Sequence, residues 1–400
     1  APSIETEIRN DLTDRAEDGA IQVFRENLRQ LLMQAPLTGK TVLGWDPAFR
    51  TGCKIAVVDP TGKVLDTTVV FPTAPQNRVE EAMRTIEALI RKHHVDVISL
   101  GNGTASRESE QIIADYIKKD HLPVQYVIVN EAGASVYSAS ALATEEFPNF
   151  DVGQRSATSM ARRLQDPMAE LVKIDPKSIG VGQYQHDMNQ TKLSEQLTSV
   201  VEDSVNSVGV DVNTASFALL SYVSGINKTI ARNIVTYREE KGAFTSRKEL
   251  LKVAKLGPKA YEQCAGFLRI RNGKEALDNT AVHPESYAVA KAVLASMGYA
   301  EEDLQDGKNA QLAAKLQSAK ASIPALAEQL QVGVYTLEDI VQELIKPGRD
   351  PREDVPTPVL RSDVLDFDDL KPEMELQGTV RNIVDFGAFV DIGVHQDGLV

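Results

Sequence analysis

Two short turns, thirty residues apart, stand directly ahead of helical patterns that carry lysine. The first turn, residues 225–227, reads Gly-Ile-Asn, and the second, residues 255–257, reads Lys-Leu-Gly. Small residues let backbone N–H groups come close to a phosphate, and the following helix presents its positively polarised N-terminus to the same group. We therefore expect each turn to bind a phosphate, helped by the cations beside it. The residues of this predicted site are Gly225, Asn227, Lys228, Arg232, Lys255, Gly257 and Lys259.

The repeated pattern resembles a tandem helix-hairpin-helix module, a unit that grips the nucleic-acid backbone without reading bases. Such a module has a glycine at the first and third positions of each turn, and here each turn keeps one of the two. Asn227 stands at the third position of the first turn, and Lys255 at the first position of the second. Asparagine tolerates the left-handed backbone conformation, so we expect Asn227 to let the first hairpin close. The alternative is that both turns only connect the helices of a bundle.

Charge favours the binding interpretation. Residues 216–275 contain twelve Lys or Arg against five Glu, within a chain whose net charge is −14. A local basic patch is the electrostatic signature of phosphate binding. The acidic balance of the whole chain argues against a binder that is basic throughout, so we expect binding to be local. A solvated helix face is the alternative explanation of these charges.

A stretch of alternating strand and helix patterns precedes these turns. Patterns typical of strands cover residues 42–46, 54–59, 64–71, 95–100 and 124–129, and helical patterns cover 77–92 and the residues after 104. Three linked strands followed by a strand–helix alternation predict an α/β domain over about residues 41–155.

Two carboxylates fall at strand ends within this domain. Asp46 ends the first strand and Glu131 follows the strand 124–129, as in an RNase H-type fold. Enzymes of that fold cleave phosphodiesters with two metal ions, which requires three or more converging carboxylates. The domain resembles the resolvase-like YqgF family, whose third acid lies on the final helix, and the matching position here is Arg155. We therefore predict no metal site and no catalytic residues, with Asp46 and Glu131 as vestigial candidates.

The remainder is helical until residue 346, after which prolines and acids indicate a linker. Residues 376–392 then alternate at the strand period around Asp-Phe-Gly, and residues 378–400 resemble the start of a ribosomal-protein-type OB-fold RNA-binding domain. Stacking faces and a cation on such a surface bind single strands. An OB barrel needs five strands, so we expect this one to be truncated. Its predicted binding residues are Arg381, Phe386, Phe389 and His395.

Composition excludes several other classes of protein. No apolar run approaches the roughly 18 residues of a membrane helix, and no signal peptide precedes the first helix. Cys53 and Cys264 lack partners at metal-binding spacing, so we expect a reducing cytoplasm, no disulfide framework and no cofactor. The sequence begins at Ala1 and stops inside the OB-like motif, so we expect it to be a piece of a longer protein.

Taken in order, these parts resemble the Tex family of bacterial transcription accessory proteins. The most specific segments of the resemblance are residues 44–54, 161–177, 179–187 and 267–287. The resemblance implies a non-enzymatic factor that binds RNA or DNA without sequence specificity. It also implies RNA polymerase or ribosome-associated transcription machinery as a partner, and a resolvase-like domain without catalytic activity.

The resemblance implies a multidomain α+β and α/β architecture. The expected boundaries are 1–40 for a helical N-terminal element, 41–155 for the RNase H-like domain, 156–215 for a helical connector, 216–285 for the tandem helix-hairpin-helix region, 286–350 for a helical region, 351–371 for an acidic Pro-rich linker and 372–400 for an incomplete OB-fold. Two alternatives stay open. One is a metal-dependent, structure-selective nuclease that uses Asp46 and Glu131. The other is a protein scaffold whose acidic residues 301–370 dock on the transcription machinery.

Overall fold

The computed structural model of the chain describes residues 2–304, 309–319, 323–361, 370–376, 378–384, 386–392, 394 and 398–400. These residues form two compact units. One comprises Ala35–Glu170 and Pro356–Val400, and the other comprises Ala1–Gln34 and Leu171–Val355.

A five-stranded sheet is the centre of the first unit. Its strands are β1 (Val42–Asp46), β2 (Cys53–Val58), β3 (Val64–Val70), β4 (Val97–Gly101) and β5 (Gln125–Val129). Their order is β3-β2-β1-β4-β5, with the first three strands antiparallel and β4 and β5 parallel to β1. The predicted α/β domain is confirmed, and this strand order is that of an RNase H-like sheet.

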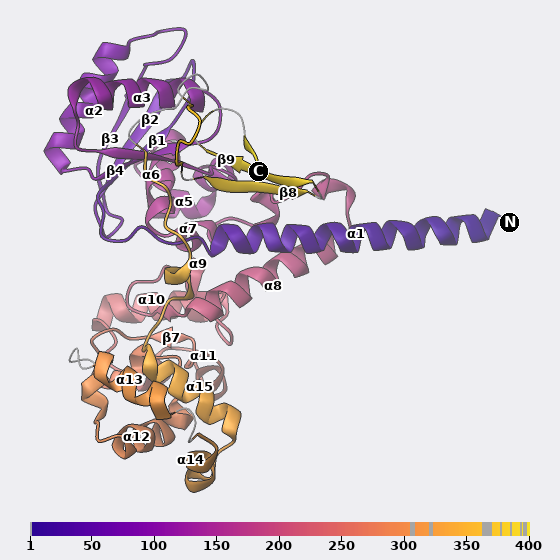
Figure 1. Ribbon diagram of the computed structural model, residues 1–400, viewed down its shortest axis with the longest axis vertical. Helices are drawn as coiled ribbons and strands as arrows, with labels where there is room; N and C mark the ends of the chain where they lie inside the picture. The colour runs from indigo at the N-terminus through magenta and orange to yellow at the C-terminus, as the bar shows by residue number, and fades with distance from the viewer. Residues whose placement is uncertain are drawn as a thin grey trace. The chain divides into compact units, whose positions relative to one another are not determined.

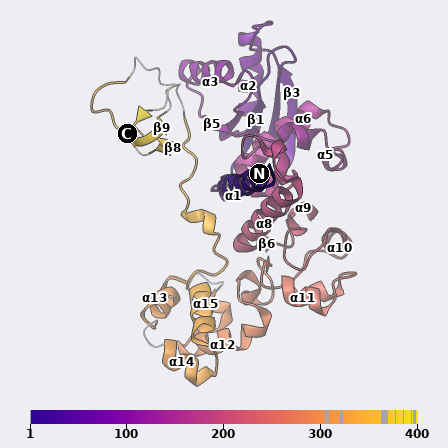
Figure 2. The same cartoon turned by 90° about the vertical axis from the view of Figure 1, so that its right-hand side faces the viewer.

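Helices cover both faces of the sheet (Figures 1 and 2). Leu43 and Trp45 of β1 lie in one core with α2 (Val79–His93) and α3 (Ser106–Asp120), whereas Val42 lies in another core with α6 (Val152–Gln165). This alternation is the period of two that a strand buried on both faces requires. At Gly44, α6 comes so close that a Cβ would lie 2.1 Å from the Ala157 carbonyl oxygen. The remaining helices near this sheet are α4 (Ala134–Ser138), α5 (Ala141–Glu146) and α7 (Pro167–Leu171).

The C-terminal part of the same unit contains a second, antiparallel sheet. It is formed by β8 (Thr379–Val384), β9 (Gly387–Asp391) and β10 (Gly398–Leu399), in the order β10-β9-β8. The predicted strand hairpin around residue 386 is therefore present. The OB-fold itself stays a prediction.

The second unit is almost entirely helical. Its long helices α1 (Pro2–Leu32) and α8 (Gln190–Val208) pack together. The other α-helices are α9 (Phe217–Leu220), α10 (Lys228–Lys241), α11 (Pro258–Cys264), α12 (Tyr287–Ser296), α13 (Asn309–Ala319), α14 (Ile323–Leu330) and α15 (Val334–Ile345). Short 3₁₀ helices are η1 (Pro176–Ser178), η2 (Gln185–Asp187), η3 (Arg247–Lys252), η4 (Ala276–Asn279), η5 (Pro284–Ser286), η6 (Glu301–Leu304) and η8 (Pro351–Asp354), and β6 (Val210–Asp211) pairs in parallel with β7 (Leu268–Arg269).

Candidate nucleic-acid interface

The first turn lies between α9 and α10. Gly225 takes the left-handed conformation with φ of +80°, and the Ile226 N–H donates to the Val223 carbonyl at 3.0 Å. Asn227 is extended, with φ of −86°, and its side chain accepts a hydrogen bond from the Ile230 N–H at 2.9 Å. Our interpretation of Asn227 as a tolerated left-handed residue is therefore wrong. The turn needs positive φ at its first position, and Asn227 at the third is the N-cap of α10.

The second turn repeats this geometry ahead of α11. Lys255 is left-handed with φ of +65°, and the Leu256 N–H donates to the Val253 carbonyl at 3.1 Å. Gly257 is extended and is the N-cap of α11, whose first residue is Pro258. Both turns thus place the left-handed residue first, a buried apolar residue second and the N-cap third.

The two turns pack on each other's helices. Gly225 lies against α11, because a Cβ there would be 2.7 Å from the Gln263 Cβ. In the reverse direction, the Asn233 side chain of α10 donates to the Ala254 carbonyl of the second turn at 2.7 Å. Asn233 and Gln263 are separated by the same thirty residues as the turns. The tandem hairpins therefore form one pseudo-symmetric unit, which predicts that they present two similar sites together.

Each helix that follows a turn begins with amide N–H groups that have no acceptor within the helix. An α-helix leaves its first four N–H groups without intrahelical acceptors. The Asn227 cap satisfies Ile230. Among the described residues, no acceptor is hydrogen-bonded to the N–H groups of Lys228 and Thr229 in α10, or of Lys259 and Ala260 in α11. These groups are arranged as an anion-binding helix N-terminus requires.

The cations predicted for this site are on the surface. The side chains of Lys228, Lys255 and Lys259 are exposed. Arg232 is also exposed, and its guanidinium lies over the Phe217 ring at 4.1 Å from the centroid. A guanidinium stacked in this way keeps its charge while its orientation is restricted. The four exposed cations thus lie in or next to the two turns and the helices that follow them.

Part of the positive charge counted over residues 216–275 belongs to arginines whose side chains are turned into the protein. Arg247 is 1% exposed, and it donates to the carbonyls of Leu268 and Val282 at 2.9 and 2.8 Å. Arg238 donates to the Val212 carbonyl, and burial lowers the pKa of Arg269 to about 10. The surface around the hairpins is therefore less basic than its composition indicates. Sequence reasoning missed these structural roles, because their acceptors lie far away along the chain.

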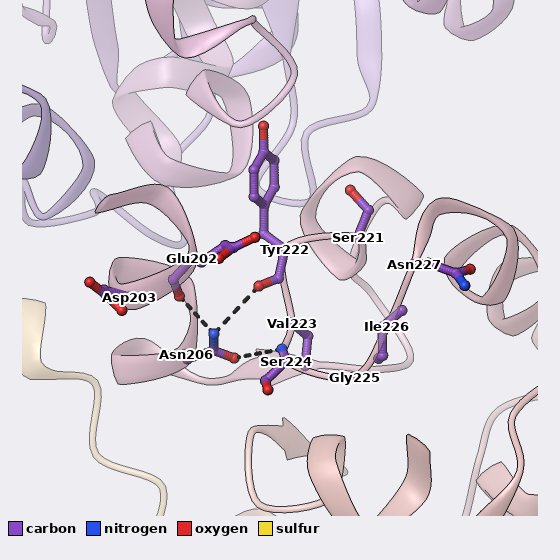
Figure 3. Close-up of a pocket in the computed structure, with 10 residues that line it drawn as sticks. All are labelled: Glu202, Asp203, Asn206, Ser221, Tyr222, Val223, Ser224, Gly225, Ile226 and Asn227. Atoms are coloured by element: carbon purple, nitrogen blue, oxygen red, sulfur yellow. Dashed lines mark hydrogen bonds between the residues drawn. The ribbon is translucent and has the colours of Figure 1, made fainter. Parts of the chain in front are cut away.

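A pocket of about 510 Å³ borders the first turn (Figure 3). Asn206 of α8 donates to the Glu202 and Tyr222 carbonyls at 2.8 and 3.4 Å, and it accepts from the Ser224 N–H at 3.1 Å. Asn206 therefore holds the start of the first turn in place, because it accepts a hydrogen bond from the N–H of Ser224, the residue just before that turn. Glu202 and the adjacent Asp203 are exposed here, so their negative charge disfavours a phosphate on this side of the turn. No motif in the sequence indicated this contribution of α8.

In the α/β domain, Asp46 ends β1 and Glu131 follows β5. These strands run parallel, so both carboxylates lie at the carboxyl-terminal end of the sheet. Burial raises the pKa of Asp46, although a hydrogen bond from Ser156 and the charge of Lys54 oppose that rise. Burial and the nearby Asp46 charge raise the pKa of Glu131, which accepts a hydrogen bond from the Gly103 N–H. Among the described residues, no group of three or more His, Cys, Asp or Glu is placed to hold a metal ion.

The residue of α6 that meets Asp46 is Ser156, not Arg155. The Arg155 guanidinium is turned to the Phe147 carbonyl at 3.0 Å and the Thr144 hydroxyl at 3.0 Å. Arg155 therefore does not contact Asp46, because a helix turns successive side chains by about 100°. The match of Arg155 to the third acidic position stays a prediction. The cation that neighbours Glu131 is instead Arg163, a residue that sequence reasoning missed.

Arg163 is 3% exposed and holds the loop that carries Glu131. Its Nη1 donates to the carbonyls of Asn130 and Ala132 at 2.9 and 2.8 Å, on either side of that carboxylate. Burial lowers the pKa of Arg163 to about 10, although the charges of Glu170 and Glu131 oppose that shift. The arrangement places a permanent positive charge beside the carboxylate pair.

The predicted stacking residues lie at the second sheet. Phe386, 74% exposed, meets Phe389 edge to face with ring centroids 6.4 Å apart. Arg381 falls within β8. His395 lies outside the described residues. The structure therefore brings two of the four predicted residues into one aromatic pair.

Comparisons with known sequences cover most of the chain. Residues 40–165 match the Tex protein YqgF-like domain, residues 205–269 a helix-hairpin-helix motif, and residues 275–352 an HHH domain. Protein tex of Bordetella pertussis is 52% identical over 399 residues, which are 100% of this chain and 49% of that protein. The Transcriptional accessory protein Tex of Neisseria gonorrhoeae is 51% identical over 399 residues, covering 100% of this chain and 51% of that protein.

The chain belongs to the Tex family.

The likeness extends beyond bacteria. The human S1 RNA-binding domain-containing protein 1 is 40% identical over 453 residues, which cover 100% of this chain and 45% of that protein. The chain spans about half the length of the curated relatives it matches. As a Tex-family chain it combines a YqgF-like domain with helix-hairpin-helix domains. None of its described helices has the length and apolarity that crossing a membrane requires.

Proposed function

We propose that the chain is a non-enzymatic factor that binds RNA or DNA through the sugar-phosphate backbone and acts in transcription. The observation that carries this proposal is the pseudo-symmetric pair of turns, each followed by N–H groups without an acceptor within the helix and by an exposed lysine. Two such sites on one rigid unit fit two phosphates of one nucleic acid. Backbone contacts of this kind position a protein without specifying a sequence.

The names of the relatives support the proposed role in transcription. One is called a transcriptional accessory protein, and another is named for an S1 RNA-binding domain. We extend these roles to the present chain, and we propose RNA polymerase or ribosome-associated transcription machinery in the cytoplasm as its protein partner. The exposed Phe386 and its neighbour Phe389 would stack on single-stranded bases. Arg381 and His395 remain proposed contacts from the sequence.

A nuclease is the second candidate, because Asp46 and Glu131 share one sheet edge with raised pKa values. Perturbed carboxylates mark many catalytic sites. The third group that reaches Asp46 is the neutral Ser156, and the buried Arg163 supplies a cation beside Glu131. These neighbours favour a structural carboxylate pair over a two-metal centre.

The test is fluorescence anisotropy with labelled single-stranded RNA, single-stranded DNA and duplex DNA. The double variant Lys228→Glu/Lys259→Glu is compared with Lys241→Glu/Lys274→Glu, which changes the same charge at two exposed lysines outside the turns. We expect binding by the parent chain, a loss of about tenfold or more in the first variant and a smaller loss in the control. Equal losses in both variants, or no binding by the parent, would contradict the proposal.

A further inference from the structure

The edge strand β5 is paired by residues that precede the C-terminal sheet. The Tyr126 N–H donates to the Arg361 carbonyl at 2.8 Å, and the Arg361 N–H donates to the Tyr126 carbonyl at 2.8 Å. These two bonds form an antiparallel bridge of the kind that joins neighbouring strands. The predicted linker 351–371 therefore contains a residue that extends the five-stranded sheet.

The side chains of Leu360 and Arg361 lie on opposite faces of the sheet, as successive side chains of a strand do. Leu360 packs with Val127 and Leu164 on the α6 side of the sheet. The next residue, Arg361, reaches the α3 side, where its Nη1 lies 3.6 Å from the Glu110 carboxylate. Alternation of an apolar and a charged side chain on opposite faces is the period of a strand.

The carboxylate that Arg361 contacts, Glu110, is almost fully buried. This carboxylate is 4% exposed, and the Tyr126 hydroxyl donates to it at 3.0 Å. A buried carboxylate is costly unless cations and donors surround it. Arg361 supplies the cation at this position, so docking of the segment and burial of Glu110 support each other.

The residues before the bridge favour an extended chain. Pro356 and Pro358 have a fixed φ near −65°, and each disfavours the helical conformation at the residue before it. Pro358 has no N–H, so it cannot donate to β5 and the pairing cannot be extended through it. The segment is thus built for a short edge contact rather than for a long strand.

We propose that the outer edge of β5 is a strand-accepting surface whose occupant is residues 359–361 of this same chain, and that this contact anchors the C-terminal sheet. In solution the docked segment fastens the tether of the C-terminal sheet to the α/β domain. Seventeen residues then separate Arg361 from β8, so the C-terminal strands stay within at most about 60 Å of the docking point. A tether of this length gives the C-terminal strands a high effective concentration near the α/β domain.

Hydrogen–deuterium exchange of the whole chain tests the docking directly. Arg361→Glu places a second carboxylate beside Glu110, whereas Lys371→Glu makes the same charge change at an exposed lysine ten residues later in the chain. We expect the Tyr126 amide to exchange slowly in the parent and in Lys371→Glu, and about tenfold faster or more in Arg361→Glu. Adding Glu110→Gln to Arg361→Glu should restore part of the protection, because it removes the repulsion.

Fluorescence of Trp45, the single tryptophan and fully buried, checks that the α/β domain stays folded in each variant. Fast exchange of the Tyr126 amide in the parent would overturn the proposal, as would equal protection in Arg361→Glu and Lys371→Glu. The effect on the C-terminal strands rests on the proposed function, but the exchange experiment does not. Protection without nucleic-acid binding would therefore refute the function and leave the docking in place.

Discussion

Asn227 and Gly225 show how two positions of one turn carry different requirements. The first position has positive φ, which glycine adopts without cost and Lys255 adopts in the second turn. The third position is an N-cap, which asparagine fills with its side-chain oxygen and Gly257 fills without one. The residue types alone are compatible with either assignment, because asparagine is favoured both in left-handed positions and at N-caps.

Substitution at Asn227 separates these two roles. Because its side chain caps α10, we expect Asn227→Ala to lower the free energy of unfolding by about 0.5–2 kcal/mol and Asn227→Gly by only a few tenths. Urea unfolding followed by circular dichroism measures both. A left-handed role would instead make Asn227→Gly more stable than the parent, and that result would reject the cap.

The pH dependence of stability reports on Asp46. Burial raises the pKa of its carboxyl above 3.8 in the folded chain, while the unfolded chain keeps the ordinary value. Between these two pKa values the folded chain binds more protons, so stability falls as the pH rises through that window. We therefore expect Asp46→Asn to raise the urea midpoint at about pH 7 and to raise it less at about pH 4.

Asp115→Asn, at an exposed carboxylate of α3, is the matched control and should shift neither midpoint. Magnesium provides the opposing test. If Mg²⁺ raised the midpoint of the parent and not that of Asp46→Asn, the carboxylates would hold a metal, and the nuclease would become the preferred function.

Elements with a strong local pattern were predictable from the sequence. The strands of the α/β domain and the helices around the turns follow from their apolar periods, since Leu43 and Trp45 face one layer and Val42 the other. The contacts that join elements distant in the sequence were not predictable. Asn206 reaches a turn eighteen residues away, and Arg361 pairs with a strand more than two hundred residues earlier. Neither contact has a signature in local composition.

Arg247 of η3 provides a test at the level of elements. Besides donating to the carbonyls of Leu268, Leu277, Thr280 and Val282, Arg247 has its Nη1 2.7 Å from the Tyr287 hydroxyl, so it joins the hairpin unit to the helices after residue 276. We expect Arg247→Met to lower the free energy of unfolding by about 3 kcal/mol or more, because it leaves several buried acceptors without donors. Thermal and urea unfolding measure this loss.

The neighbouring Lys248 is exposed and serves as the control for Arg247. Lys248→Met should change stability by less than about 0.5 kcal/mol. Equal effects of the two substitutions would mean that the buried arginine network contributes little to joining these elements.

At the scale of the whole molecule, an acidic chain carries exposed lysines beside its hairpins. Its net charge is −14, and several arginines near the hairpins are turned inward. We therefore propose that binding relies on a few phosphates held by N–H groups and exposed lysines, rather than on a general attraction. Such binding is weak at a distance, sensitive to salt and indifferent to sequence.

The salt dependence of affinity tests this central claim most directly. The logarithm of the association constant for labelled nucleic acid is measured against the logarithm of salt concentration for the parent and for Lys228→Ala/Lys259→Ala. Each lost phosphate contact reduces the slope by about one, so we predict a slope shallower by about two in the double variant. An unchanged slope would show that the two hairpins do not hold the phosphates.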